Sequence, residues 1–156
     1  MTAAHPLNKD GPTDKSRSAG KDQIAGSAHS SPSGAVVSYL NDASFDRGLR
    51  EFFEYRDLGV AEATGGAFAV HVIRALADHE ASGIPHLHQL DFQFVYVLQG
   101  WVEFEYEHTG TVRLQKGDSV YQPPGIRHRE IRHSADLEML EIVSPASFPT
   151  QTLEHV

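Results

Sequence analysis

The sequence predicts an all-β fold, either a small antiparallel barrel or a jelly roll. About eight to ten short apolar or alternating runs recur at about ten-residue spacing. Turn-forming residues separate these runs, as is typical of hairpin connections. No segment shows the three-to-four-residue apolar period of a convincing amphipathic helix. A barrel of this kind has a mouth where side chains from several strands can converge on a ligand.

The composition limits both the size of the fold and its partners. With 156 residues, 40% of them apolar and 22% charged, the chain has room for one domain with a substantial core and hardly for two. Its formal net charge of −8 argues against nucleic-acid binding. Cysteine is absent, which excludes disulfides, thiolate nucleophiles and cysteine-ligated zinc. Neither an apolar run of about 18 residues nor a signal-peptide core is present, so we expect a cytoplasmic protein with no membrane partner.

Residues 1–34 differ in character from the rest of the chain. Ser, Ala, Gly, Lys, Asp and Pro dominate them, and Leu7 and Ile24 are their only large aliphatic residues. Such a segment buries too little apolar area to offset the entropy of ordering it. We therefore expect a disordered N-terminal segment over residues 1–34, followed by one β-barrel domain over residues 35–156.

The predicted strands begin after residue 50. Within residues 67–76, Phe68, Val70 and Val72 alternate with smaller or polar residues, which is the period of a strand. His71 lies on the opposite face, where we interpret it as a surface or hydrogen-bonded histidine because no second ligand is spaced with it. Further strands are expected in the following stretches: 92–100, 101–107, 111–116, 118–122, 128–133 and 137–145.

Three histidines indicate a metal site. His86 and His88 lie two residues apart on a predicted strand, so their side chains point to the same face and can meet one metal ion. His128 follows a Pro-Pro-Gly turn at the start of another strand. The alternative is a metal-free barrel with hydrogen-bonded imidazoles. Gln93 shares the face of His86 and His88 only if the chain bends between Gln89 and Asp91.

These stretches resemble the two motifs of the cupin family. The first motif is His-x-His, three or four residues, Glu, six residues and Gly, and its positions hold His86, His88, Gln93 and Gly100. The second is Gly, five residues, Pro-x-Gly, two residues, His, three residues and Asn, and its positions hold Gly117, Pro123, Gly125, His128 and Arg132. The chain departs from the pattern in having Gln for Glu and Arg for Asn. The resemblance covers about residues 50 to 145.

The resemblance implies a jelly-roll barrel of two facing antiparallel sheets. It also implies one divalent ion per chain, held by His86, His88, Gln93 and His128, with Fe, Zn, Ni, Mn or Cu as candidates. A glutamine oxygen is a neutral and weaker ligand than a carboxylate, so the ion would keep its full charge and favour an anionic small-molecule ligand. Asp91 is a rival fourth ligand, although its position on the expected bend favours a solvent-facing side chain.

Four charged residues have more than one interpretation. Glu130 and Glu141 can serve as acid or base if they point inward, and the strand period leaves the face of Glu141 undecided. Arg127 and Arg129 flank His128, where a solvated rim is the commoner case and attraction of a substrate carboxylate is the alternative. We assign no catalytic residue from the sequence.

The resemblance implies several functions, because the family includes dioxygenases, isomerases, lyases and cyclases. Our first hypothesis is a small metalloenzyme with dioxygenase-like chemistry on an organic substrate that chelates the ion through oxygen atoms. The alternatives are a zinc-dependent cyclase, isomerase or lyase, a non-catalytic small-metabolite-binding protein, and a structural metal. We also expect a homodimer, because residues 51–58 and 94–97 carry more apolar surface than one small barrel needs to bury.

Overall fold

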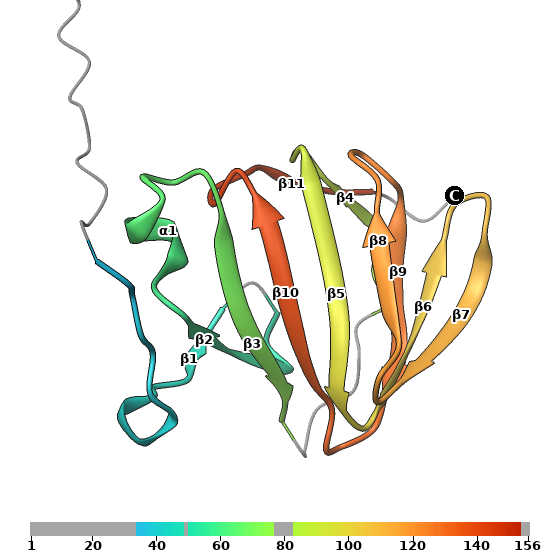
Figure 1. Cartoon of the computed structure of the whole chain (residues 1–156). Coiled ribbons are helices and arrows are strands. Elements are labelled where there is room, and N and C mark those ends of the chain that lie inside the picture. Colours follow the sequence, from blue (N-terminus) through green and yellow to red (C-terminus); the bar gives the residue numbers. More distant parts are fainter. Residues whose placement is uncertain (1–33, 49, 77–82, 154–156) are drawn as a thin grey trace, which may run out of the picture.

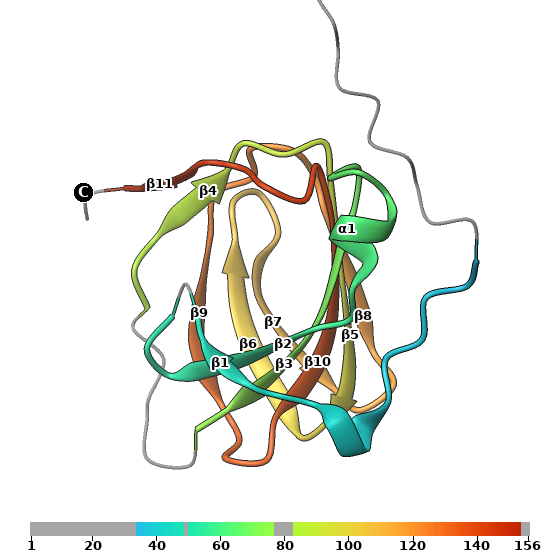
Figure 2. The ribbon, with the colours of Figure 1, turned by 90° about the vertical axis from the view of Figure 1, so that its left-hand side faces the viewer.

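Two antiparallel sheets face each other in the computed structural model, which describes residues 34–48, 50–76 and 83–153 (Figures 1 and 2). One sheet has the strand order β1 (Asp46–Arg47), β2 (Phe53–Asp57), β3 (Ala69–Ala75), β10 (Glu138–Ser144), β5 (Phe92–Gln99) and β8 (Ser119–Gln122). The other has the order β11 (Thr150–Thr152), β4 (His86–His88), β9 (His128–His133), β6 (Trp101–Tyr106) and β7 (Gly110–Gln115). The prediction of an all-β barrel with two antiparallel sheets is therefore confirmed.

Helix is scarce in the described part of the chain. A 3₁₀ turn spans Leu40–Asp42, and α1 is a single turn, Val60–Ala63, inside the segment between β2 and β3. Within the described residues, no helix is long and apolar enough to cross a membrane. Residues 1–33 lie outside the described ranges. The expected disorder of residues 1–34 therefore stays a prediction.

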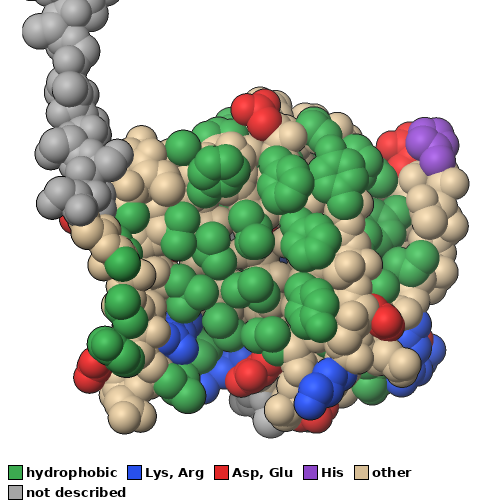
Figure 3. Space-filling model, in the orientation of Figure 1, with side chains coloured by type: hydrophobic (Ala, Val, Ile, Leu, Met, Phe, Trp, Pro, Cys, Tyr) green, Lys and Arg blue, Asp and Glu red, His purple; other side chains and the backbone are tan. Residues whose placement is uncertain are grey.

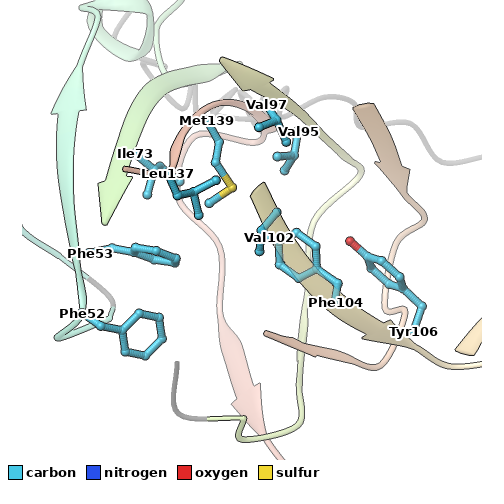
Figure 4. Packing of buried hydrophobic residues seen from close by; sticks show 10 residues of the cluster. All are labelled: Phe52, Phe53, Ile73, Val95, Val97, Val102, Phe104, Tyr106, Leu137 and Met139. Atoms are coloured by element: carbon cyan, nitrogen blue, oxygen red, sulfur yellow. The ribbon is translucent and has the colours of Figure 1, made fainter. Parts of the chain in front are cut away.

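The core fills the space between the two sheets, where both contribute alternating apolar side chains (Figure 4). Its ten buried members are Phe52, Phe53, Ile73, Val95, Val97, Val102, Phe104, Tyr106, Leu137 and Met139. Burying one large apolar side chain stabilises a fold by about 1.5–3 kcal/mol. The stability of the barrel therefore comes mainly from these residues and not from the histidines.

Two of the core aromatics correct an expectation from the sequence. Phe52 and Phe53 are only 5% and 1% exposed, so residues 51–58 do not offer them to a partner subunit. Val95 and Val97 also point inward, which leaves Phe94 and Tyr96 for the outer face of β5. The outer face of β5 in the six-stranded sheet, and not Phe52 and Phe53, thus presents apolar side chains to the surface.

The chain changes sheets between β4 and β5. His88 ends β4 in the five-stranded sheet, a bend lies at Asp91, and Gln93 follows in β5 of the six-stranded sheet. This bend lets Gln93 face the histidines across the barrel interior although it lies five residues after His88. The bend that the sequence required between Gln89 and Asp91 is therefore confirmed.

Gly100 makes the next change of sheet, from β5 to β6. Its φ of +68° lies in the left-handed region, and a Cβ atom there would lie 2.9 Å from Cα of Leu137 and would clash with Ser134. Only glycine satisfies both the conformation and the close contact. The close packing of Leu137 and Ser134 thus explains why the first histidine motif ends in a glycine.

Candidate metal centre

Three histidine side chains converge inside the barrel. His86 and His88 come from β4, and His128 is the first residue of β9, where the strand register places it directly opposite His86. The three residues are 1%, 6% and 4% exposed, respectively. One ring nitrogen from each lies within 4.8 Å of the others, an arrangement that can hold a metal ion. The structure thus brings together all three histidines that the sequence singled out.

Two of the rings are held by the same local hydrogen bond. Nδ1 of His86 lies 3.0 Å from the carbonyl oxygen of Ile84, and Nδ1 of His128 lies 3.1 Å from the carbonyl oxygen of Ile126. A carbonyl oxygen only accepts hydrogen bonds, so each Nδ1 carries the proton and donates it. Each Nε2 therefore keeps its lone pair for a metal, a common arrangement for metal-binding histidines.

His88 is held by a neighbouring strand. Its Nδ1 lies 2.9 Å from Oγ1 of Thr150, which the register of β4 and β11 places opposite it. Its ring also lies edge-on to the ring of Phe148, with 5.2 Å between the centroids. With Nδ1 engaged, Nε2 is again the nitrogen available inside the barrel.

All three imidazoles are neutral at neutral pH. Burial is the main cause that lowers the pKa of His86 and of His128 to about 4 and that of His88 to about 3. Neighbouring histidines also lower the pKa values of His88 and His128, because two charged rings in one small site repel. Three neutral, oriented imidazoles fit a first-row divalent ion. The chemistry of this donor set therefore agrees with the metal that the cupin resemblance implies.

Gln93 lies across the interior from the histidines. It is 4% exposed and lines the same cavity, and its Nε2 donates a hydrogen bond of 2.8 Å to Oε1 of Glu141. That bond engages the nitrogen end of the amide and leaves the carbonyl oxygen as its ligand atom. Asp91, the rival, is exposed and does not line the cavity. This placement favours Gln93 as the fourth ligand, which stays a prediction.

The cavity beside the triad measures about 60 Å³, which is room for a few water-sized groups. Two carboxyl groups line it, those of Glu130 and Glu141. Glu141 thus points inward with Leu137 and Met139, which settles the face that the strand period left undecided. Burial raises the pKa of Glu141, and its Oε2 lies 3.9 Å from Nδ1 of His71. His71 is not part of the triad, which agrees with the expectation that it is no ligand, but its Nδ1 is closed to solvent and has no hydrogen-bond partner among the described residues, so it is neither a surface nor a hydrogen-bonded histidine.

A glutamine that the sequence analysis missed completes the wall. Gln122 on β8 is 2% exposed, lies opposite Gln93 in the strand register and donates a 2.7 Å hydrogen bond from Nε2 to the hydroxyl oxygen of Tyr106. The Tyr106 ring stacks on that of His128 at 5.8 Å between centroids. Gln122 ends its short strand just before the Pro-Pro turn, and no sequence pattern marks it as inward.

The arginines next to His128 lie outside this cavity. Arg127 and Arg129 line a surface pocket beside His128, and Arg129 pairs with Glu105. Arg132, at the motif position of the family's asparagine, forms an ion pair with Glu103. Of the two interpretations of Arg127 and Arg129, the solvated rim agrees with these contacts.

Comparison with known proteins identifies a cupin domain. Residues 72–143 match the model of this domain, and the two-sheet barrel agrees with the match. Comparison with curated protein sequences gives no significant match.

Three solved structures are similar in fold. The polyketide cyclase RemF from Streptomyces resistomycificus is 16% identical with a TM-score of 0.62, over 76% of this chain and 85% of that one. KdgF from Halomonas is 19% identical with a TM-score of 0.57, over 70% and 94% of the two chains. A Streptomyces PAC13 variant with uridine is 13% identical with a TM-score of 0.57, over 76% and 90%. At these identities the likeness shows the fold alone.

The metal-free protein should lose stability as the pH falls from about 6.5 to about 4. A histidine whose pKa is lower in the folded than in the unfolded state binds its proton more readily when unfolded, so acid favours unfolding. The contribution of the histidines is fully present above about pH 6.5, and each histidine should remove about 1.4 kcal/mol per pH unit below it. Urea unfolding at several pH values measures this slope.

The raised pKa of Glu141 acts in the opposite direction, because a buried carboxyl group stabilises the fold when protonated. The informative quantity is therefore the difference between the wild type and His128→Asn in the slope of the unfolding free energy against pH, because both proteins contain Glu141. His128→Asn should show a shallower slope, whereas His108→Asn, at a turn position with an 89% exposed side chain, should match the wild type. Equal slopes in all three proteins would contradict the burial of neutral imidazoles.

Proposed function

We propose that this protein is a small metalloenzyme whose substrate is an organic molecule that binds the ion through oxygen atoms. His86, His88, His128 and Gln93 would hold one divalent ion per chain. The observation that carries the proposal is the shared orientation of the three imidazoles, whose Nδ1 atoms are all engaged and whose Nε2 atoms are left for one ion. When bound, such an ion supplies Lewis acidity, or redox chemistry if it is iron or copper.

The lining of the cavity favours an enzyme over a structural metal. Catalysis needs an acid or a base in addition to the ligands, and the carboxyl groups of Glu130 and Glu141 both line the cavity. The rest of its wall includes the apolar side chains of Phe53, Ile73 and Met139, which keep bulk water away from a bound substrate. Glu141 is suited to carry a proton, because burial raises its pKa.

Two reaction classes are candidates for this site. Oxidative, dioxygenase-like cleavage is our first candidate, because a histidine-rich site with an oxygen-chelating substrate suits Fe(II). Lewis-acid chemistry, as in a zinc-dependent cyclase, isomerase or lyase, is the second, and the two carboxyl groups in the cavity favour it because such reactions move protons. Similar folds are found in an iron(II) protein, HppE, in an oxalate decarboxylase and in a polyketide cyclase, so the fold does not choose between the classes.

Metal analysis of protein purified from its native host separates these classes. Iron would support the oxidative reaction and zinc the Lewis-acid reaction. If the purified protein holds no stoichiometric metal and takes up none in a titration, the metalloenzyme proposal is wrong, and a metal-free binding protein is the remaining alternative.

Replacing a single histidine of the triad should remove most of the bound metal. His86→Ala, His88→Ala and His128→Ala each delete one ligand, and we expect metal affinity to fall by about 100-fold or more in each. Isothermal titration with Zn²⁺ measures this loss. The melting temperature of the metal-free protein should change little, since the apolar core stabilises the barrel. His108→Asn serves as the control, and a triad variant that binds Zn²⁺ like the control would exclude that histidine as a ligand.

The contribution of Gln93 to metal binding can be tested by exchanging the amide of Gln93 and the carboxyl group of Glu141. Gln93→Glu alone sets two carboxyl groups at hydrogen-bond distance, so they share a proton and the site gains little charge. The double variant Gln93→Glu/Glu141→Gln restores one amide and one carboxylate, with the carboxylate now facing the triad. Zn²⁺ affinity should rise by about tenfold or more in the double variant and by less in the single one. Unchanged affinity in both would exclude Gln93, and Asp91 or water would be the fourth ligand.

We also propose a homodimer, formed through the outer face of the six-stranded sheet. Figure 3 shows a continuous apolar surface over β3, β10, β5 and β8, with charged side chains mostly around its margin. Five large side chains there are between 36% and 50% exposed: Phe68, Phe92, Tyr96, Leu98 and Tyr121. Contiguous exposed apolar surface of this kind usually marks an interface. A second copy suits it, because two such faces related by a two-fold axis cover each other without unpaired charges.

Light scattering after size exclusion tests the dimer. The wild type should have the mass of two chains at micromolar concentration, and Tyr96→Glu, which places a charge in the centre of the face, should have the mass of one. Lys116→Glu, a charge change outside this face, is the control and should remain dimeric. A monomeric wild type would exclude this proposal.

A further inference from the structure

Three polar side chains line the cavity with an atom that has no hydrogen-bond partner within the described part of the chain. These atoms are Nη2 of Arg50, Oε1 of Gln122 and Oε2 of Glu130, and all three are closed to solvent. Glu130 and Gln122 are 8% and 2% exposed as whole residues. Buried polar atoms are nearly always paired in folded proteins, so three unpaired ones around one cavity point to a ligand.

We propose that Arg50, Gln122 and Glu130 form a subsite for a small hydroxycarboxylic acid, the substrate class of the metal site. Arg50 binds the carboxylate, while Gln122 or Glu130 accepts the single proton of the hydroxyl group. This assignment rests on the proposed function, because the acid would also bind the ion, through the carboxylate oxygen that Nη2 of Arg50 leaves free.

The chemistry of each group selects its partner. A guanidinium only donates hydrogen bonds, and a carboxylate is the acceptor that matches its planar fork. Gln122 already uses Nε2 on the hydroxyl of Tyr106, so the oxygen that remains only accepts and requires a donor. A carboxylate oxygen of Glu130 likewise accepts. A hydroxyl group has one proton to donate, so a molecule that carries a carboxylate and a hydroxyl group matches Arg50 and one of the two acceptors, and a water molecule beside it donates to the other.

The charge of the cavity agrees with this class. Within the described ranges, no carboxylate forms an ion pair with Arg50, so its charge is available to a ligand. The same charge helps to lower the pKa values of all three triad histidines, which places the guanidinium within electrostatic range of the metal site.

A matched set of three-carbon probes tests the subsite on the full-length, zinc-loaded protein. Lactate carries both groups, propionate lacks the hydroxyl and 1,2-propanediol lacks the carboxylate. In isothermal titration, lactate should bind about tenfold or more tightly than either of the others. Glu130→Gln should reduce the preference for lactate over propionate, because an amide is a weaker acceptor than a carboxylate.

Variants of Arg50 separate this subsite from the metal site. Arg50→Gln should weaken lactate binding by about tenfold or more, Arg50→Lys should weaken it by less, and both should leave Zn²⁺ affinity within about twofold of the wild type or higher. Arg113→Gln, at a 53% exposed surface position, is the control. Melting curves and circular dichroism confirm that the variants are folded.

Each outcome decides one proposal. Unchanged lactate affinity in Arg50→Gln, or equal binding of the three probes, would overturn the subsite and mean that only water satisfies these atoms, while a normal Zn²⁺ titration would leave the metal site intact. Conversely, lactate binding that depends on Arg50 in a protein that takes up no Zn²⁺ would support the subsite and contradict the proposed metalloenzyme.

Discussion

The pairing of His86 with His128 across β4 and β9 is the constraint on which the site depends. The register of antiparallel strands has a period of two, so a slip by one residue would turn these side chains away from the interior. The same pairing rules place Thr150 beside His88 and Gln122 beside Gln93. The site is therefore a consequence of backbone hydrogen bonding between strands that are far apart in the sequence.

The replacement of the family's glutamate by Gln93 has a different consequence from the one expected from the sequence. The sequence indicated no carboxylate among the four ligands and left the face of Glu141 open, and the structure places the carboxyl group of Glu141 next to the Gln93 amide. When ionised, Glu141 still attracts a cation, but through an amide and over a longer distance, so the attraction is weaker. The carboxyl group of this centre is thus on Glu141, behind the Gln93 amide as seen from the histidines. There, burial favours the protonated form of the carboxyl group.

The features predicted correctly from the sequence depend on local spacing. Alternation marked the strands, two-residue spacing brought His86 and His88 to one face, and the five-residue offset of Gln93 required the bend that the structure contains. The burial of Phe53 and the inward face of Glu141 could not be predicted, because they depend on how β2 and β10 pair with β3. Arg50 was missed for the same reason, since it lies outside the motifs and reaches the cavity only in the closed barrel.

The inner and outer faces of the six-stranded sheet are mechanically linked. On β5, Gln93 points into the cavity while the neighbouring Phe92 and Tyr96 are exposed on the outer face, and Glu141 lies on the adjacent strand β10. Close-packed sheets transmit small displacements, because side chains on both faces share one backbone. A second copy that covered the outer face would restrain the strands that carry the Gln93–Glu141 pair. Assembly and metal geometry would then be coupled through β5 and β10, although the proposed interface and the proposed metal site lie on opposite sides of the sheet.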